Sequence, residues 1–350
     1  MDDKISQLPD DLLLKVLLFL PTKVAASTSI LSKRWEFLWM WLSKLEYNSI
    51  EEKNYDCEER RNLQNFIDLN LPLHRAPVIE SFCLKFSKGS YRSFKPTVIK
   101  MWVLIAVSRC LRELSLDLFA CTSWPTCLPS SLYTCKSLVI LKLIDKIFVD
   151  VPRMACLPSL KTLFLRRVTY SNENSLHQLL SSCPVLEDLV LERGDGLRNP
   201  GIDKWRVIVP SLQRLTIKIS RCSNFDEVVI NTPSLKYFKV TDYKEEYVSE
   251  NDDDRYSFKF KDMPQLEEAD IDSTYPDIDK FVKSIKFVKR LSLCIIVNAE
   301  EDLYPEGIVF NHLEHLKLCP CHSNWSKLLV RLLKDSPNLR ELEVSLNDDH

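Results

Sequence analysis

The sequence predicts an α/β protein in which a short helical N-terminal segment precedes a solenoid of repeated strands. Two observations lead to this fold class. Residues 5–41 combine an apolar helix with a cluster of tryptophans, and from Ile79 onward one leucine-rich pattern recurs almost to the end of the chain. At 350 residues, with 45% hydrophobic and 27% charged side chains, the composition is that of an ordinary globular protein.

The first helix is predicted to begin at Pro9 and to run to the proline at position 21. Proline suits the first helical turn because its missing N–H is not needed there, and Asp10 and Asp11 lie where the helix dipole favours negative charge. Apart from Lys15, residues 12–20 are all apolar. One buried stripe cannot account for a helix that is apolar on nearly every side.

Two further short helices are expected in the N-terminal segment. The second covers residues 24–28, and Ser32 is placed to cap a third that carries Trp35, Trp39 and Trp41. About forty residues cannot enclose this much apolar surface by themselves. The surplus implies a protein partner.

The repeated pattern has a leucine, two residues, an apolar residue, one residue and a second apolar residue. Most members begin about 22 to 27 residues apart, which is the leucine-rich-repeat period, with longer steps from Ile79 to Leu111 and from Leu235 to Leu266. A proline often precedes the motif by two residues and ends the preceding segment. About ten such units stack into a curved solenoid with a parallel sheet. The motifs are expected to begin at Ile79, Leu111, Leu138, Leu160, Leu186, Leu212, Leu235, Leu266, Val288, Leu313 and Leu339.

Between the strands, four segments are predicted to be helical: residues 96–109, 175–182, 278–287 and 325–334. The predicted domain organisation is an N-terminal helical domain over 1–45, a linker and leading helix over 46–78, the solenoid over 79–346 and a tail over 347–350. The twelve cysteines are expected to be reduced, because no secretory signal pattern opens the chain. Four of them precede a repeat motif and are expected to lie in the core: Cys110, Cys135, Cys156 and Cys183.

Catalytic and cofactor motifs are scarce. Five glycines leave no phosphate-binding loop or nucleophile elbow, so we expect no cofactor and no enzymatic activity. The cluster His312, His315, Cys319, Cys321 and His322 suggests zinc ligands, but four residues along a strand separate two side chains by about 13 Å, so no metal site is predicted. A net charge of −2 argues against a nucleic acid partner, and no segment is long enough to suggest a membrane partner. The expected location is the cytoplasm, the nucleus or both.

The outward positions of the solenoid strands are the predicted target-binding surface. Central strands carry a basic band there, and the next strand carries an acidic band; adjacent bands of unlike charge could orient a charged segment of a partner. For any one of these residues, the competing explanation is that a polar side chain at an outward position of a repeat is simply solvated and binds no partner. The candidate residues are Arg214, Lys218, Tyr237, Lys239, Glu268, Asp270 and Asp272.

The N-terminal segment resembles an F-box of the large plant F-box/FBD/LRR group. The resemblance is carried by Leu8-Pro9-Asp10, by Phe19-Leu20-Pro21-Thr22-Lys23 and by Leu31-Ser32-Lys33-Arg34-Trp35. The repeats resemble the same group, most closely over residues 256–279 and 310–342. Many members continue into a C-terminal FBD module, which the chain, ending at His350, is expected to lack.

The resemblance implies the substrate-recognition subunit of an SCF-type cullin–RING ubiquitin ligase. The F-box would bind the Skp-type adaptor, which joins it to the cullin and RING subunits, and the repeats would bind the target protein. The implied adaptor contacts are Leu8, Pro9, Leu13, Val16, Leu17, Leu20 and Trp35.

Val24 departs from the family pattern, because relatives usually carry an acidic residue after the lysine. This departure keeps open an alternative, an LRR interaction scaffold that is not coupled to a ligase. A receptor that holds a small ligand on the outward face is a third hypothesis, which nothing in the sequence favours.

Overall fold

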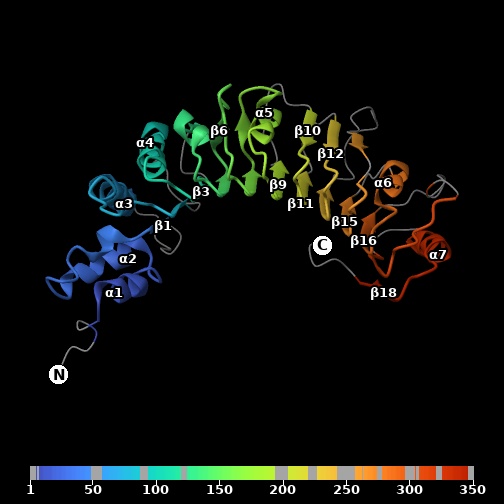
Figure 1. The fold of residues 1–350 in the computed structure, drawn as a ribbon, viewed down its shortest axis with the longest axis horizontal. Coiled ribbons are helices and arrows are strands. Elements are labelled where there is room, and N and C mark those ends of the chain that lie inside the picture. Colours follow the sequence, from blue (N-terminus) through green and yellow to red (C-terminus); the bar gives the residue numbers. More distant parts are fainter. Residues whose placement is uncertain are drawn as a thin grey trace. The chain divides into compact units, whose positions relative to one another are not determined.

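The computed structural model describes residues 5, 8–48, 57–86, 94–119, 124–193, 204–219, 227–242, 257–261, 263–273, 278–295, 304, 307–320 and 325–345 (Figure 1). The chain forms two compact units, residues 1–164 and residues 165–350. Both consist of parallel strands with helices and turns between them. The α/β fold class, helices followed by a largely parallel repeat sheet, is confirmed.

Unit 1 begins with short helices. Helix α1 (Asp10–Leu17) is shorter than predicted, because residues 18–20 form a turn in which the Phe19 and Leu20 amides bond to carbonyls three residues back. Helix α2 (Thr22–Ser27) and the 3₁₀ turn η1 (Thr28–Ile30) follow.

The predicted third helix is not a continuous α-helix. Residues 33–37 are turns and only η2 (Leu38–Trp41) is helical, of the 3₁₀ type. The Trp35, Leu38 and Met40 amides each bond to a carbonyl three residues earlier. Phe37, at φ −120° and ψ 0°, interrupts the helical conformation. The segment nevertheless buries Trp35, Leu38 and Trp39, as a helix would.

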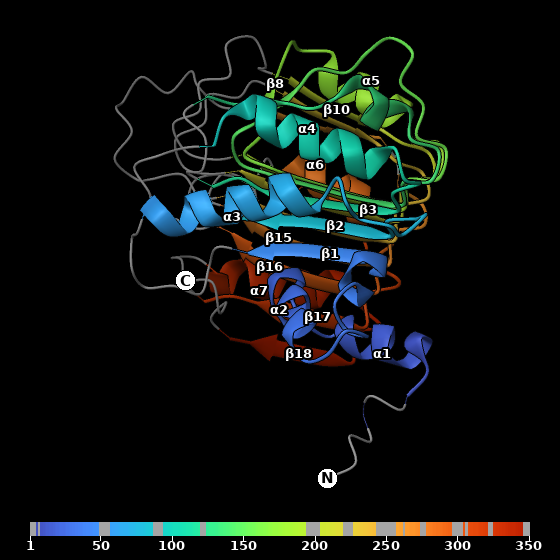
Figure 2. The same cartoon turned by 90° about the vertical axis from the view of Figure 1, so that its left-hand side faces the viewer.

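The repeat sheet of unit 1 starts earlier than the predicted solenoid. Strand β1 pairs in parallel with β2, so the first repeat strand lies across the predicted boundary between the N-terminal domain and the linker. Figure 2 shows these strands side by side with α3 and α4 along them. The elements of this unit are β1 (Lys44–Asn48), α3 (Cys57–Asn70), β2 (Ser81–Lys85), α4 (Pro96–Val107), β3 (Glu113–Asp117), β4 (Thr126–Cys127), η3 (Ser130–Thr134), β5 (Ile140–Ile144) and β6 (Ile147–Val149). Strand β7 (Thr162–Arg166) crosses the boundary between the units.

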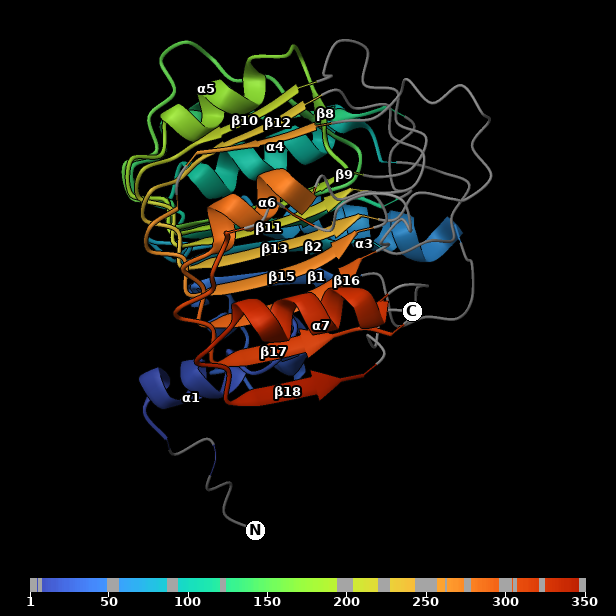
Figure 3. The same ribbon diagram turned by 90° about the vertical axis from the view of Figure 1, so that its right-hand side faces the viewer.

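The described residues of unit 2 contribute strands to the main sheet and to a second parallel sheet, and they include three α-helices; β8 belongs to the small sheet β4-β6-β8. In the main sheet the order is β9-β11-β13-β15-β16-β17-β18, and a second sheet has the order β10-β12-β14. Figure 3 shows β17 and β18 at one end, with α7 beside them. The elements are β8 (Thr169–Tyr170), α5 (Ser175–Ser181), β9 (Asp188–Arg193), β10 (Lys204–Ile208), β11 (Arg214–Ile219), β12 (Glu227–Asn231), β13 (Tyr237–Asp242), β14 (Ser257–Phe260), β15 (Glu268–Ser273), α6 (Ile278–Ile285), β16 (Arg290–Ile295), β17 (His315–Leu318), α7 (Trp325–Asp335) and β18 (Glu341–Val344).

One hydrogen-bonded joint repeats along both units. Before most strands of the main sheet, the preceding carbonyl accepts two consecutive amides from the next repeat, as Gln213 does from Lys236 and Tyr237. Ser43 does the same for Glu80 and Ser81, which makes β1 a regular member of the array. Because backbone groups are satisfied between neighbouring repeats, each repeat fixes the register of the next.

The core consists of the motif leucines and their apolar equivalents. Leu141, Leu189, Leu215 and Phe238 are at most 1% exposed, whereas the outward positions of the same strands remain in contact with solvent. The last strand differs, because its motif residues Leu342 and Val344 are 44% and 43% exposed. Among the described residues no helix is long and apolar enough to span a bilayer.

Candidate protein-docking surfaces

The helices at the start of unit 1 expose an unusual amount of apolar surface. Along α1 and the turn after it, Leu12, Val16 and Phe19 recur at i, i+4 and i+7 and are 43%, 46% and 89% exposed. Leu13 and Leu17, on the neighbouring stripe, are completely buried. We call the exposed set the N-terminal apolar surface. Its members are Leu12, Val16, Phe19, Leu20, Val24, Ile30, Leu31, Phe37 and Trp41.

The predicted adaptor contacts divide into two groups. Pro9, Val16 and Leu20 are exposed and Leu8 is half-buried, so all four are accessible. Leu13, Leu17 and Trp35 are at most 5% exposed. Their assignment as contact residues is corrected: they form the core that supports the surface.

Sequence reasoning missed several exposed apolar residues, most clearly Phe19, Ile30 and Leu31, which are 89%, 89% and 65% exposed. For Phe19 the signal was its helical spacing from Leu12 and Val16. For the other two, no periodic pattern distinguished the exposed side from the core.

Polar contacts fix these helices in place. The Arg34 guanidinium donates to Asp10 Oδ1 from Nε at 2.9 Å and from Nη2 at 2.6 Å, which joins the end of the segment to the first turn of α1. The buried Thr22 hydroxyl oxygen accepts the Glu46 amide at 2.8 Å, which joins α2 to β1. The N-terminal helices are therefore attached directly to the first repeat strand.

His74 strengthens the same junction. Its Nε2 lies 2.6 Å from the Leu42 carbonyl oxygen, and burial lowers its pKa to about 4. A neutral imidazole with the proton on Nε2 fits this geometry. The Arg109 side chain donates to the His74 carbonyl at 2.5 Å, which connects the end of α4 to this junction.

In unit 2 the outward face of the main sheet forms a groove of about 750 Å³ over β13 and β15–β18. Strand register arranges the outward polar side chains of these strands in rows. One row runs Tyr237, Glu268, Arg290, His315 and Glu341, and the next runs Lys239, Asp270, Ser292, Lys317 and Glu343. Of the predicted target-binding residues, Lys239, Glu268, Asp270 and Asp272 line the groove, whereas Arg214, Lys218 and Tyr237 do not.

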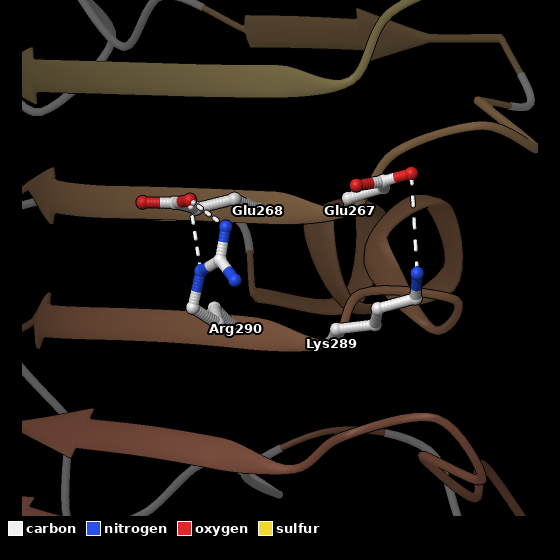
Figure 4. A network of polar contacts seen from close by, with 4 residues as sticks. All are labelled: Glu267, Glu268, Lys289 and Arg290. Atoms are coloured by element: carbon white, nitrogen blue, oxygen red, sulfur yellow. Dashed lines mark hydrogen bonds and ion pairs between the residues drawn. The ribbon is translucent and has the colours of Figure 1, made fainter.

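Within these rows, opposite charges pair with neighbouring strands. Arg290 donates to Glu268 Oε2 from Nε at 3.0 Å and from Nη2 at 2.7 Å, and Lys289 lies 3.9 Å from Glu267 just before the same strands (Figure 4). Lys239 Nζ lies 2.9 Å from Asp270 Oδ2. The remaining ladder pairs are Arg214 with Asp188, His315 with Glu341, and Lys317 with Glu343.

This pairing corrects the prediction of separate basic and acidic bands. Arg214 and Lys239 already form ion pairs with carboxylates on adjacent strands. Each side chain therefore produces a much weaker electrostatic field than an unpaired cation would. Asp272 lies at an outward position but is 5% exposed. The Cys294 thiol is buried beside the Asp272 carboxylate. Burial, and to a smaller extent the negative charge of Asp272, raise the pKa of this thiol to about 12.

The histidine and cysteine cluster does not form a metal site in the part of the chain that the structure describes. His315 pairs with Glu341. Cys321 and His322 lie outside the described residues. Cys319 is disulfide-bonded, so the expectation that every cysteine is reduced is wrong at this position. Of the four cysteines expected in the core, Cys135 and Cys183 are buried, whereas Cys110 and Cys156 are exposed, so the core assignment is wrong for these two.

These features define the class of protein as a helical docking segment joined to a leucine-rich-repeat unit. Comparison with known families agrees. The F-box domain model matches residues 5–47, and a model described as FBD-associated F-box protein At5g56370, LRR repeats, matches residues 99–269.

Relatives cover nearly the whole chain. The putative F-box/LRR-repeat protein At4g15060 of Arabidopsis thaliana is 69% identical over 99% of this chain and 80% of its own length. The putative F-box/FBD/LRR-repeat protein At4g00315 of the same plant is 58% identical over 99% of this chain and 79% of its own length. FBD-associated F-box protein At4g10400, also from that plant, is 51% identical over the same shares. The chain therefore belongs to the plant F-box/LRR-repeat family, a class of protein-interaction adaptors.

Proposed function

We propose that this chain is the substrate-recognition subunit of an SCF-type cullin–RING ubiquitin ligase. The F-box binds the Skp-type adaptor, and the groove of unit 2 receives the target protein. The chain performs no chemistry of its own and contributes proximity, because the ubiquitin-carrying groups belong to other subunits. It acts in the cytoplasm, the nucleus or both.

The N-terminal apolar surface carries this proposal. Phe19 and Ile30 are each 89% exposed. Two large apolar side chains in water do not stabilise the free chain, and a group of such side chains on one surface is typical of a protein-interaction site. Burial of each on binding stabilises a complex by about 1.5–3 kcal/mol. A partner that covers several such side chains gains enough to offset the cost of association.

The junction between α2 and β1 supports the F-box half of the proposal. The contacts of Thr22 with Glu46 and of His74 with Leu42 attach the F-box directly to the first repeat strand of unit 1. An adaptor bound to the F-box would therefore be held next to the start of the repeats.

The test is a pull-down of the full chain with a purified Skp-type adaptor. The variant carries Val16→Ala and Phe19→Ala, and the matched control carries Met101→Ala and Leu104→Ala, which are 59% and 47% exposed on α4. We expect adaptor capture to be lost in the first and kept in the second. Equal capture by both variants contradicts the proposed docking surface.

The uncoupled scaffold is the second candidate, and Val24 is the observation that favours it. This residue is 47% exposed on α2, so it changes the polarity of the docking side of the F-box. The scaffold predicts that the folded wild-type chain does not bind the adaptor, and that Val24→Glu restores binding. Binding by wild type excludes it.

A further inference from the structure

The second sheet of unit 2 presents a basic face that the proposed function does not use. Strands β10, β12 and β14 pair in parallel, with Lys204 opposite Glu227 and Val229 opposite Lys259. One side of this sheet is buried through Trp205, Val207, Val228, Ile230 and Phe258. The Phe260 ring lies 5.8 Å from the Phe238 ring of β13 in an edge-to-face arrangement. The sheet thus packs on the main sheet on the side opposite the groove, and its other side is open.

The open side is strongly basic. Lys204 and Arg206 on β10, Lys259 on β14 and Lys261 just after it are all exposed, and we call these four residues the outer basic face. Among the outward positions of the three described strands, Glu227 is the sole carboxylate, and it pairs with Lys259. These described positions therefore carry a net charge of about +3, on a chain whose net charge is −2.

These cations act on a common region of space. Neighbouring strands lie about 4.8 Å apart, and alternate residues of one strand about 6.7 Å apart. The hydrogen bond from Lys259 lowers the pKa of Glu227, and the charges of Lys204 and Arg206 lower it further. Within the described residues, no ion pair neutralises Lys204, Arg206 or Lys261.

Apolar side chains lie among the cations. Ile208 is 37% exposed at the end of β10, and Val229 is half-buried on the central strand. The face therefore offers cationic positions with apolar positions between them. The outward positions of the described strands include no aromatic side chain on which a base could stack, which disfavours single-stranded nucleic acid.

We propose that the outer basic face docks an extended acidic segment of a partner protein, in which carboxylates alternate with apolar side chains. The carboxylates meet Lys204, Arg206 and Lys261, and the apolar side chains meet Ile208 and Val229. Because this face lies opposite the groove, both surfaces of unit 2 can be occupied together. The docking of this segment is independent of the F-box and of the adaptor.

The test measures fluorescence anisotropy of a labelled ten-residue peptide of alternating Glu and Val with the full chain in 50 mM salt. The variant Lys204→Gln, Arg206→Gln, Lys261→Gln should weaken binding about tenfold, as expected for three exposed ion pairs. The matched control is Lys236→Gln, Lys283→Gln, Lys334→Gln, which removes three exposed cations elsewhere in unit 2 and should bind as wild type does.

Further arms separate the proposal from its alternatives. A peptide of alternating Glu and Ser should bind more weakly than the Glu-Val peptide. The conservative pair Lys204→Arg, Lys261→Arg should retain binding even if the triple variant is unstable. Equal loss in the control variant overturns the proposal. Tighter binding to single-stranded DNA or to phosphatidylserine vesicles, lost in the triple variant, also overturns it and assigns the face to those ligands.

Discussion

Replacing Phe19 by alanine should weaken adaptor binding without unfolding the chain, whereas replacing Leu17 should do the reverse. The two residues are two positions apart in the sequence, yet Phe19 is 89% exposed and Leu17 is fully buried. Their contrast separates the docking surface from the core that supports it.

The magnitudes follow from these exposures. Truncating a buried leucine costs about 2–5 kcal/mol of folding stability, because it removes apolar contacts and leaves a cavity. Truncating the exposed Phe19 should change stability by no more than about 0.5 kcal/mol. If the adaptor buries that ring, the same change loses about 1.5–3 kcal/mol of binding, which is roughly a 10- to 100-fold weaker complex.

Two assays decide the outcome. Urea denaturation followed by circular dichroism gives the free energy of unfolding, and calorimetric titration with the Skp-type adaptor gives the dissociation constant. Met154→Ala is the matched control for Phe19→Ala, because Met154 is 83% exposed in the same unit outside the F-box. Wild-type affinity in Phe19→Ala would refute the docking surface, and wild-type stability in Leu17→Ala would refute the assignment of the core.

Three further predictions concern stability. Because burial holds the His74 pKa near 4, below its unfolded value of about 6.5, the folded chain loses up to about 3 kcal/mol as pH falls through this window. His74→Gln should show a shallower loss between pH 7 and pH 5 in urea denaturation; parallel curves would contradict this. Leu291→Ala, at a motif position 2% exposed, should cost about 2–5 kcal/mol, and the equivalent Leu342→Ala, 44% exposed, about 1 kcal/mol or less. Equal melting points in these two variants would contradict the burial difference. A double-mutant cycle on Arg290 and Glu268 should give a coupling of about 0.2–1 kcal/mol that shrinks in high salt, since the pair is exposed; a larger, salt-independent value would contradict a surface pair.

Much of the repeat fold could be predicted because its signal is local and repeated. Each motif leucine occupies the same buried environment, so one pattern identifies many strands at once. Helices α4, α5, α6 and α7 begin at the predicted residues and end within two residues of the predicted positions.

Strand β1 shows how a weak member of the series is missed. Leu42, Leu45 and Tyr47 have the repeat spacing and are 1%, 1% and 2% exposed. The aromatic residue in the last position and the adjacent F-box concealed this motif. The Ser43 carbonyl, which accepts the Glu80 and Ser81 amides, identifies it as the first repeat.

The docking surfaces depend on tertiary structure in a way that local patterns do not record. Leu12 and Leu13 are both leucines in one apolar run, and only packing against the rest of the F-box makes the second a core residue and leaves the first 43% exposed. The same applies to the outward charges. Arg290 and Glu268 are 22 residues apart in sequence, and only the parallel register of β15 and β16 makes them a hydrogen-bonded pair.

The sequence by itself determined the family, the F-box, the repeated strands and most of the helices, because residue identity and short-range periodicity control local structure. Tertiary structure alone decided which apolar side chains stay exposed, which charges are neutralised by a neighbouring repeat, and which face of the second sheet stays open. The physical reason is that burial and ion pairing depend on distances between residues far apart in the chain. Strand register sets those distances, and no single repeat contains them.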